Sequence, residues 1–214
     1  MTIALYFSPG ACSTAPHIVL NEIGVEYEQR KTVLADKANY TPEYLAINPK
    51  ARVPVILIDG FVLTEVPAIL TYLAQRFPQA GLLPAGGEPM ARCLEWLAYC
   101  SSTVHPCYAH LRKPERYTAD ASAFPGLQER GEAGFIDCIT YIDGKLAGKQ
   151  FAAGDAYSIA DAYLLVFFGW ASGLKKHNMA ERFPNYTAVV RRILARPAVQ
   201  RTIEIEGIKA RFEI

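Results

Sequence analysis

A cysteine at the start of a predicted helix is the residue of this chain best placed for chemistry. A short apolar run at residues 3–7 is typical of a strand, and a Pro-Gly break separates it from Cys12. Ser13 or Thr14 can cap the helix that follows, which Gly24 would end. The free N–H groups and the dipole at a helix N-terminus stabilise a thiolate and lower its pKa from about 8.5 toward neutrality. We therefore expect a functional thiol at Cys12.

Three further side chains have types and positions that suit a site. Glu65 comes just before a predicted helix, where N–H groups bind an anion and its own carboxylate can bind an amine. The alternative for Glu65 is a surface charge at a helix N-terminus. His105 lies in a later helix and can act as a base or tune a thiolate. Tyr6 ends the first strand and could donate to a thiolate, although a tyrosine on a strand is more often a core residue.

The first half of the chain reads as a βαβ unit followed by a hairpin and a helix. After the helix that ends at Gly24, a second strand is predicted, and Thr41 can cap a short helical turn. The signal Asp59-Gly60 predicts a hairpin turn. The expected elements are strands at 3–7, 25–33, 53–58 and 61–63, and helices at 14–23, 41–47 and 67–77.

The second half of the chain is predicted to be helical throughout. A stretch rich in Gly, Pro and Ala without periodicity indicates a linker. Ser158 and Asp161 form a capping box before a strongly apolar run. The expected helices span 90–107, 127–146, 162–170, 184–194 and 198–206. The fold class is therefore α/β followed by all-α, with domains at 1–80 and 89–214 joined by a linker at 81–88.

Composition limits the partners of the chain. Of its 214 residues 51% are hydrophobic, and its formal net charge is +1, which gives no reason to expect nucleic acid or an anionic membrane as a partner. No apolar run approaches the ~18 residues of a membrane span. Five cysteines cannot all pair, and none of their spacings is Cys-x-x-Cys. We expect a cytoplasmic protein in a reducing compartment, with no metal site.

The order of elements resembles the soluble glutathione transferases, whose first domain is thioredoxin-like. Within that superfamily, a set of short motifs in order along nearly the whole chain is similar to the bacterial beta class. The motifs are Gly10-Ala11-Cys12-Ser13, Pro16-His17-Ile18-Val19-Leu20, Asn48-Pro49-Lys50, Val53-Pro54-Val55, Leu63-Thr64-Glu65 and Val104-His105.

The resemblance assigns roles toward glutathione, the expected cosubstrate. It implies a cis peptide before Pro54, a Val53 backbone that pairs with the cysteinyl part of glutathione, and a Glu65 that meets its γ-glutamyl end. Cys12 would form a mixed disulfide or hydrogen-bond to the glutathione sulfur. His105 would face Cys12 across a cleft.

Two basic residues and one departure from the family pattern complete the expected site. Arg52, or Lys37, can pair with the glycyl carboxylate of glutathione, although a lone basic side chain is usually a solvated one. Val66 follows the acid where the family has a small residue, so it lacks a hydroxyl and can crowd the peptide. Pro106 replaces a lysine and is expected to kink its helix.

The resemblance implies a homodimeric detoxification enzyme that adds the thiol of glutathione to a small hydrophobic electrophile or exchanges thiols. Two alternatives stay open. One is a glutathione-dependent disulfide reductase or peroxidase with Cys12 as nucleophile. The other is a noncatalytic interaction protein with the same fold, of the stringent starvation protein A type, which Val66, Arg52 and Pro106 favour.

Overall fold

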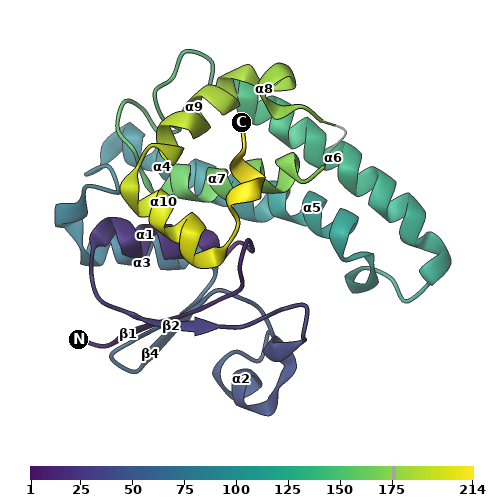
Figure 1. Ribbon diagram of the computed structural model, residues 1–214, viewed down its shortest axis with the longest axis horizontal. Coiled ribbons are helices and arrows are strands. Elements are labelled where there is room, and N and C mark those ends of the chain that lie inside the picture. The colour runs from purple at the N-terminus through teal and green to yellow at the C-terminus, as the bar shows by residue number, and fades with distance from the viewer. Residues whose placement is uncertain (175–176) are drawn as a thin grey trace.

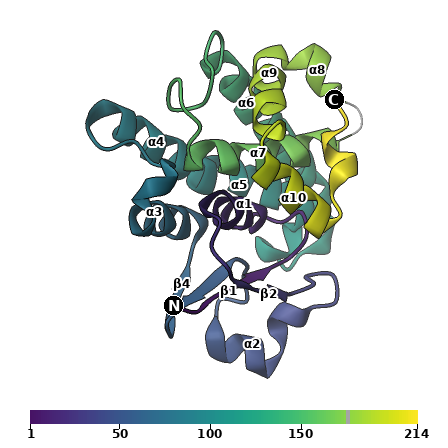
Figure 2. The same cartoon turned by 60° about the vertical axis from the view of Figure 1, so that its left-hand side comes forward.

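A four-stranded sheet forms one end of the molecule, and a group of helices covers one of its faces (Figures 1 and 2). The computed structural model describes residues 1–174 and 177–214. The strands are β1 (Ile3–Phe7), β2 (Glu28–Lys31), β3 (Val55–Ile58) and β4 (Phe61–Thr64), in the spatial order β2-β1-β3-β4. β1 pairs in parallel with β2 and antiparallel with β3, and β3 pairs antiparallel with β4.

Alternation along β1 explains how the sheet is covered. The side chains of Ile3, Leu5 and Phe7 belong to the main core together with α1 (Thr14–Ile23) and α3 (Val66–Arg76). Tyr6 points to the opposite face, where it packs with Tyr44 of α2 (Pro42–Ile47) in a small second cluster. The short helix α2 therefore lies on the other side of the sheet from α1 and α3, as both views show.

From residue 87 onward every named element is a helix. They are α4 (Gly87–Tyr99), the π-helical segment η3 (Cys100–Val104), α5 (His105–Arg112), the 3-10 turns η4 (Pro114–Arg116) and η5 (Ala121–Ala123), α6 (Phe124–Lys145), α7 (Ile159–Ser172), α8 (Met179–Arg182), α9 (Pro184–Leu194), α10 (Pro197–Glu206) and the turn η6 (Lys209–Phe212). Below, residues 3–80 are called the sheet part, which ends with the turn η2 (Pro78–Ala80), and residues 87–212 the helical part.

The expected fold class is confirmed, and several individual elements differ from expectation. The second strand is shorter than the predicted 25–33 and is largely exposed. Instead of one helix at 90–107, α4, η3 and α5 run on from residue 87 to 112. The π-helical η3 ends two residues before Pro106, where a kink was expected. Such a segment accommodates a residue that cannot donate to the helix ladder.

The helix at the centre of the helical part is buried almost all round. Ser158 and Asp161 form the predicted capping box at the start of α7, and every residue of α7 from Ile159 to Ala171 is buried. The carboxylate of Asp161 also accepts from the N–H of Ala152, at 2.8 Å. Two donors outside the helix are thereby satisfied in the core, which fixes the loop before α7.

Candidate active site

A cleft of about 960 Å³ lies between the sheet part and the helical part. Its lining comes from the loop at 8–12, the loop at 48–54, the start of α3, and α5 with the residues that follow it. Seven of the nine residues predicted from the sequence line it: Cys12, Arg52, Val53, Pro54, Glu65, Val66 and His105. Four separate parts of the chain therefore meet here, as the motifs predicted.

Two predicted residues are not among those that line the cleft. The hydroxyl of Tyr6 accepts a hydrogen bond from Arg30, and its ring lies in the cluster on the α2 side of the sheet. Lys37 is exposed and holds a left-handed conformation, with φ of 55°, in the turn before η1 (Ala38–Tyr40). Neither side chain therefore lines the cleft, although Tyr6 shares the cluster on the α2 side of the sheet with Val53.

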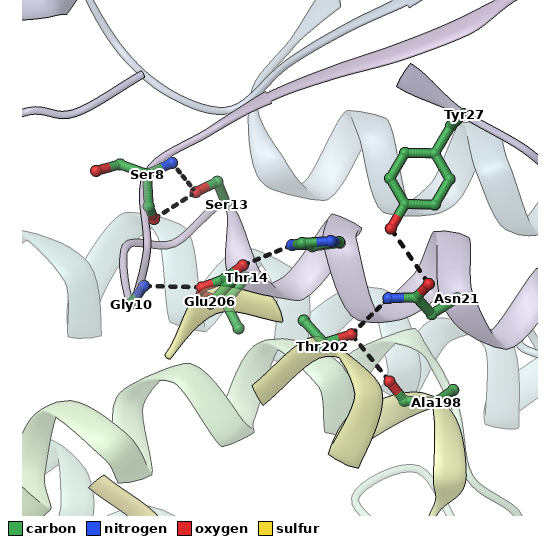
Figure 3. A network of polar contacts seen from close by, with 10 residues as sticks. Ser8, Gly10, Ser13, Thr14, Asn21, Tyr27, Ala198, Thr202 and Glu206 are labelled. Carbon is green, nitrogen blue, oxygen red and sulfur yellow. Dashed lines mark hydrogen bonds and ion pairs between the residues drawn. The ribbon is translucent and has the colours of Figure 1, made fainter. Parts of the chain in front are cut away.

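Hydrogen bonds within the loop hold Cys12 at the entrance of α1. The hydroxyl of Ser13 accepts from the N–H of Ser8 at 3.0 Å and donates to the carbonyl of Ser8 at 3.2 Å (Figure 3). The N–H of Ala11 donates to that same carbonyl. The predicted helix cap at Ser13 or Thr14 is wrong, because the Ser13 side chain closes the loop instead and makes no cap hydrogen bond.

The last long helix anchors this loop from the helical part. A carboxylate oxygen of Glu206 accepts from the N–H of Gly10 at 2.8 Å and from the hydroxyl of Thr14 at 2.7 Å (Figure 3). The other oxygen lies 2.7 Å from Nδ1 of His17, and both side chains are fully buried. The sequence predictions did not include this network, because Glu206 is 196 residues away from Gly10 and carries no local signal.

The carbonyl of Gly10 is also hydrogen-bonded by side chains of the helical part. The indole N–H of Trp170 donates to it at 2.9 Å and the guanidinium of Arg211 at 2.7 Å. A Cβ at Gly10 would lie 2.5 Å from the Arg211 guanidinium carbon, and the backbone φ is +68°. Both conditions favour glycine, because other residues rarely adopt that conformation and would displace the Arg211 guanidinium from the Gly10 carbonyl.

Burial controls the chemistry of the Cys12 thiol. The thiol donates to the carbonyl of Val53 at 3.3 Å, and only 8% of the residue is exposed. Desolvation raises the pKa of Cys12 from its ordinary value of 9.0 to about 12, which outweighs the backbone N–H groups of Cys12 and Ser13 that favour the thiolate. The expected pKa near neutrality is therefore wrong, because the helix start lies in a dry environment. At neutral pH this residue is a thiol and a hydrogen-bond donor.

The peptide before Pro54 is cis, as the resemblance implied. The loop that leads to it is fixed by two side chains, since the Tyr44 hydroxyl and the Asn48 amide both donate to the carbonyl of Arg52, at 2.6 and 2.7 Å. Arg52 itself is exposed, and its guanidinium donates to the carbonyl of Ala51. This arrangement holds the backbone of Val53 beside the cysteine.

Glu65 stands at the start of α3 with an unusual backbone. Its φ is 72°, and its carboxylate pairs with Lys50, which also donates to the Thr64 hydroxyl at 2.6 Å. Lys50 belongs to the motif Asn48-Pro49-Lys50, but it was not predicted to be a site residue. The side chain of Val66 packs into the core, where 4% of the residue is exposed. Its bulk is therefore directed mainly into the protein, although the residue still lines the cleft.

His105 is neutral at physiological pH. Burial, with the nearby guanidiniums of Arg116 and Arg52, lowers its pKa to about 4. Its ring lies 5.0 Å from the ring of Trp170. A base with so low a pKa holds a proton poorly near pH 7. Hydrogen bonding therefore fits His105 better than the expected role as a base.

The described part of the chain contains neither a cluster of metal ligands nor a helix that could span a membrane. Residues 1–174 and 177–214 contain no group of three His, Cys, Asp or Glu side chains that could hold a metal ion. No helix in the same ranges is long and apolar enough to cross a membrane.

Comparison with known proteins finds similarity along nearly the whole chain. The family model of the glutathione S-transferase N-terminal domain matches residues 1–75, and that of the C-terminal domain matches residues 138–197. The glutathione S-transferase GstA of Escherichia coli O157:H7 is 33% identical over 211 residues, which cover 96% of this chain and 99% of the relative.

Solved structures agree with this similarity. A glutathione transferase homologue from Sulfitobacter, with bound glutathione, superimposes with a TM-score of 0.90 at 30% identity over 97% of this chain and 99% of the other. A bacterial beta class glutathione S-transferase from Sphingomonas chungbukensis gives a TM-score of 0.83 at 32% identity, over 96% and 99% of the two chains.

Proposed function

Since the chain belongs to the glutathione S-transferase family, we propose that its cleft binds glutathione beside Cys12 and adds the glutathione sulfur to an electrophile. One observation carries this proposal. Cys12, the Val53 carbonyl next to the cis peptide, and the Glu65 helix start line one cleft. Residues 1–80 would bind glutathione, residues 89–214 would hold the electrophile, and residues 81–88 would link them.

Each part of glutathione has a counterpart in the cleft. The Glu65 carboxylate suits the amine, and the N–H groups at the start of α3 suit the γ-glutamyl carboxylate. The backbone of Val53 suits the cysteinyl peptide. Lys50 and Arg52 lie in the neighbouring loop and suit the glycyl carboxylate.

The protonation state of Cys12 supports conjugation. A thiol that donates a hydrogen bond can stabilise the glutathione thiolate without forming a disulfide. In the reaction a C–S bond forms, the leaving group departs with its bonding electrons, and the thiol proton passes to solvent. A reductase or peroxidase would need Cys12 as a thiolate, which burial opposes. The relatives described above are transferases by name, which favours an enzyme over a noncatalytic protein.

The test is a glutathione titration by calorimetry together with conjugation of 1-chloro-2,4-dinitrobenzene. We expect micromolar to millimolar affinity, and we expect Glu65→Gln to weaken binding about tenfold, because it removes the charge that meets the amine. Glu26→Gln is the matched control, since Glu26 is exposed and does not line the cleft. The proposal would be contradicted if the protein neither bound glutathione at ~10 mM nor conjugated the substrate. Absence of binding at that concentration means a binding free energy weaker than about 3 kcal/mol.

A homodimer is proposed from two exposed apolar patches. Phe61 and Val62 lie on the edge strand β4 and are 51% and 40% exposed. Tyr141 of α6 is 49% exposed and packs on Tyr99 of α4. In the proposed twofold interface, the β4 patch of each subunit packs on the α6 patch of its partner. The interface thereby covers the exposed edge of the sheet.

Sedimentation velocity tests the dimer. We expect a species of about twice the 23.6 kDa chain mass and a shift toward monomer in Phe61→Glu. Ile205→Glu, at another exposed apolar position on α10, should leave the mass unchanged. A wild-type monomer at micromolar concentration would reject the dimer.

Location in the cytoplasm is also proposed. All five cysteines are free thiols, which suits a reducing compartment. Conjugation of electrophiles there is the chemistry of detoxification.

A further inference from the structure

The cleft concentrates positive charge far beyond the average of the chain. The chain carries a net charge of +1. The cleft is lined by one carboxylate, that of Glu65, and by seven basic side chains: Lys31, Lys50, Arg52, Arg112, Lys113, Arg116 and Arg211. Such a lining attracts anions and raises their local concentration.

Most of these cations have no carboxylate partner among the residues that the structure describes. Lys50 pairs with Glu65, and Lys113 lies 3.8 Å from Glu115. Within residues 1–174 and 177–214, no carboxylate forms an ion pair with the guanidiniums that line the cleft, which are those of Arg52, Arg112, Arg116 and Arg211.

Two of these guanidiniums repel each other across the cleft. Partial burial and the charge of Arg52 lower the pKa of Arg116. Both charges also act on His105. A ligand with negative charge would relieve this repulsion, because like charges held together cost free energy that an anion offsets.

Glutathione can account for only part of this charge. On the proposed function, its two carboxylates meet the start of α3 and the loop that carries Lys50 and Arg52, both in the sheet part. Arg112, Arg116 and Arg211 belong to the helical part, on the side proposed to hold the second substrate. Arg211 donates to the carbonyl of Gly10, so Arg112 and Arg116 are left for the other reactant.

Tyr108 and Trp170 form an apolar wall of the cleft in the helical part, near these guanidiniums. The ring of Tyr108 stacks on Trp170, with centroids 4.3 Å apart and an interplanar angle of 17°. The charges of Arg112 and Arg211 both act on the Tyr108 hydroxyl. A flat molecule against this wall would have its edge close to fixed positive charge.

We propose that the preferred second substrate is an aromatic electrophile that bears a carboxylate, with its ring against the Tyr108–Trp170 wall and its carboxylate facing Arg112 and Arg116. This inference rests on the proposed function and specifies its substrate class. A bidentate pair between arginine and carboxylate would fix the orientation of the ring. Positive charge near the ring would also stabilise the negative charge that the ring gains when the sulfur attacks.

A matched pair of substrates tests the proposal. The neutral substrate is 1-chloro-2,4-dinitrobenzene, and the anionic one is 4-chloro-3,5-dinitrobenzoate. In each, a C–S bond to glutathione forms, the C–Cl bond breaks, chloride leaves with the electron pair, and the thiol proton goes to solvent. The readout is the ratio of kcat/KM for the anionic over the neutral substrate, corrected for the uncatalysed rates.

We expect this ratio to exceed one in the wild type, to fall about tenfold in Arg116→Gln and further in the double variant with Arg112→Gln, and to fall with added salt. Arg201→Gln, which removes an equal charge on the exposed surface of α10, should leave the ratio unchanged. A ratio that does not respond to either arginine would overturn the proposal while leaving the transferase function intact.

Calorimetry with the two glutathione conjugates gives a second readout that needs no turnover. Tighter binding of the carboxylated conjugate, lost in Arg116→Gln, supports the proposal. Equal binding of both conjugates would overturn this inference and leave the proposed transferase function standing. If the wild type neither binds a conjugate nor turns over either substrate, the proposed function fails and this inference fails with it.

Discussion

Glu206→Ala is expected to lower the free energy of unfolding by about 3–5 kcal/mol. The carboxylate is fully buried, and it accepts from the N–H of Gly10 and the hydroxyl of Thr14 while contacting His17. Alanine leaves these polar groups in the core without an acceptor, and each buried group that loses its partner costs about 1–3 kcal/mol. Urea denaturation measures the loss.

Two further variants make this result specific. Glu206→Gln keeps the volume and one acceptor oxygen, so we expect an intermediate loss. Glu204→Ala removes an exposed acid from the same helix and should change stability by less than about 0.5 kcal/mol. If Glu206→Ala were no more harmful than Glu204→Ala, the network would have no energetic role.

Alkylation of Cys12 by iodoacetamide at pH 7.5 is expected to be about a thousandfold slower than that of a free cysteine. The thiolate is the reactive form, and burial raises the pKa of Cys12 to about 12. A raised pKa means that the proton stays bound as the pH rises through the range where an ordinary thiol ionises. The rate should therefore climb about tenfold per pH unit through pH 9, without a plateau.

Mass spectrometry of the peptide that contains Cys12 follows this reaction, and Cys12→Ser assigns the signal. Free cysteine, alkylated in a separate tube, is the reference thiol, because glutathione would bind beside Cys12. A plateau below pH 8 would mean that the thiol is ionised at neutral pH, and it would restore the reductase alternative. The expected slow reaction instead makes Cys12 a donor to the sulfur of another molecule.

Local signals in the sequence predicted most of the fold. A short apolar run located β1, and the Asp59-Gly60 turn signal located the hairpin of β3 and β4. The capping box of Ser158 and Asp161 located the start of α7. These features act between residues close in sequence, so the pattern itself records them. The π-helical form of η3 depends on how that stretch packs, which local periodicity does not contain.

The sequence predicted which candidate residues meet in one cleft, but it did not predict the protonation state of Cys12. Motifs brought Cys12, Val53 and Glu65 together correctly, because each lies in a loop whose neighbours are strong signals. The pKa of Cys12 could not be predicted in the same way, because a helix start favours a thiolate only where water reaches it. The contacts of Glu206, Trp170 and Arg211 with Gly10 join distant parts of the chain, and no single-sequence pattern reveals them.

The anchoring of Gly10 from the helical part bears on how the two parts can be recombined. Both backbone groups of a residue in the cysteine loop are bonded by side chains from α7, α10 and η6. A chimera that joins this sheet part to the helical part of a relative would keep the loop that carries Gly10. It would lose the Trp170 and Arg211 donors and the Glu206 acceptor unless the relative had equivalent side chains. The two parts are therefore not interchangeable modules. A change of sequence in the loop that carries Gly10 requires a matching change in the helical part that anchors it.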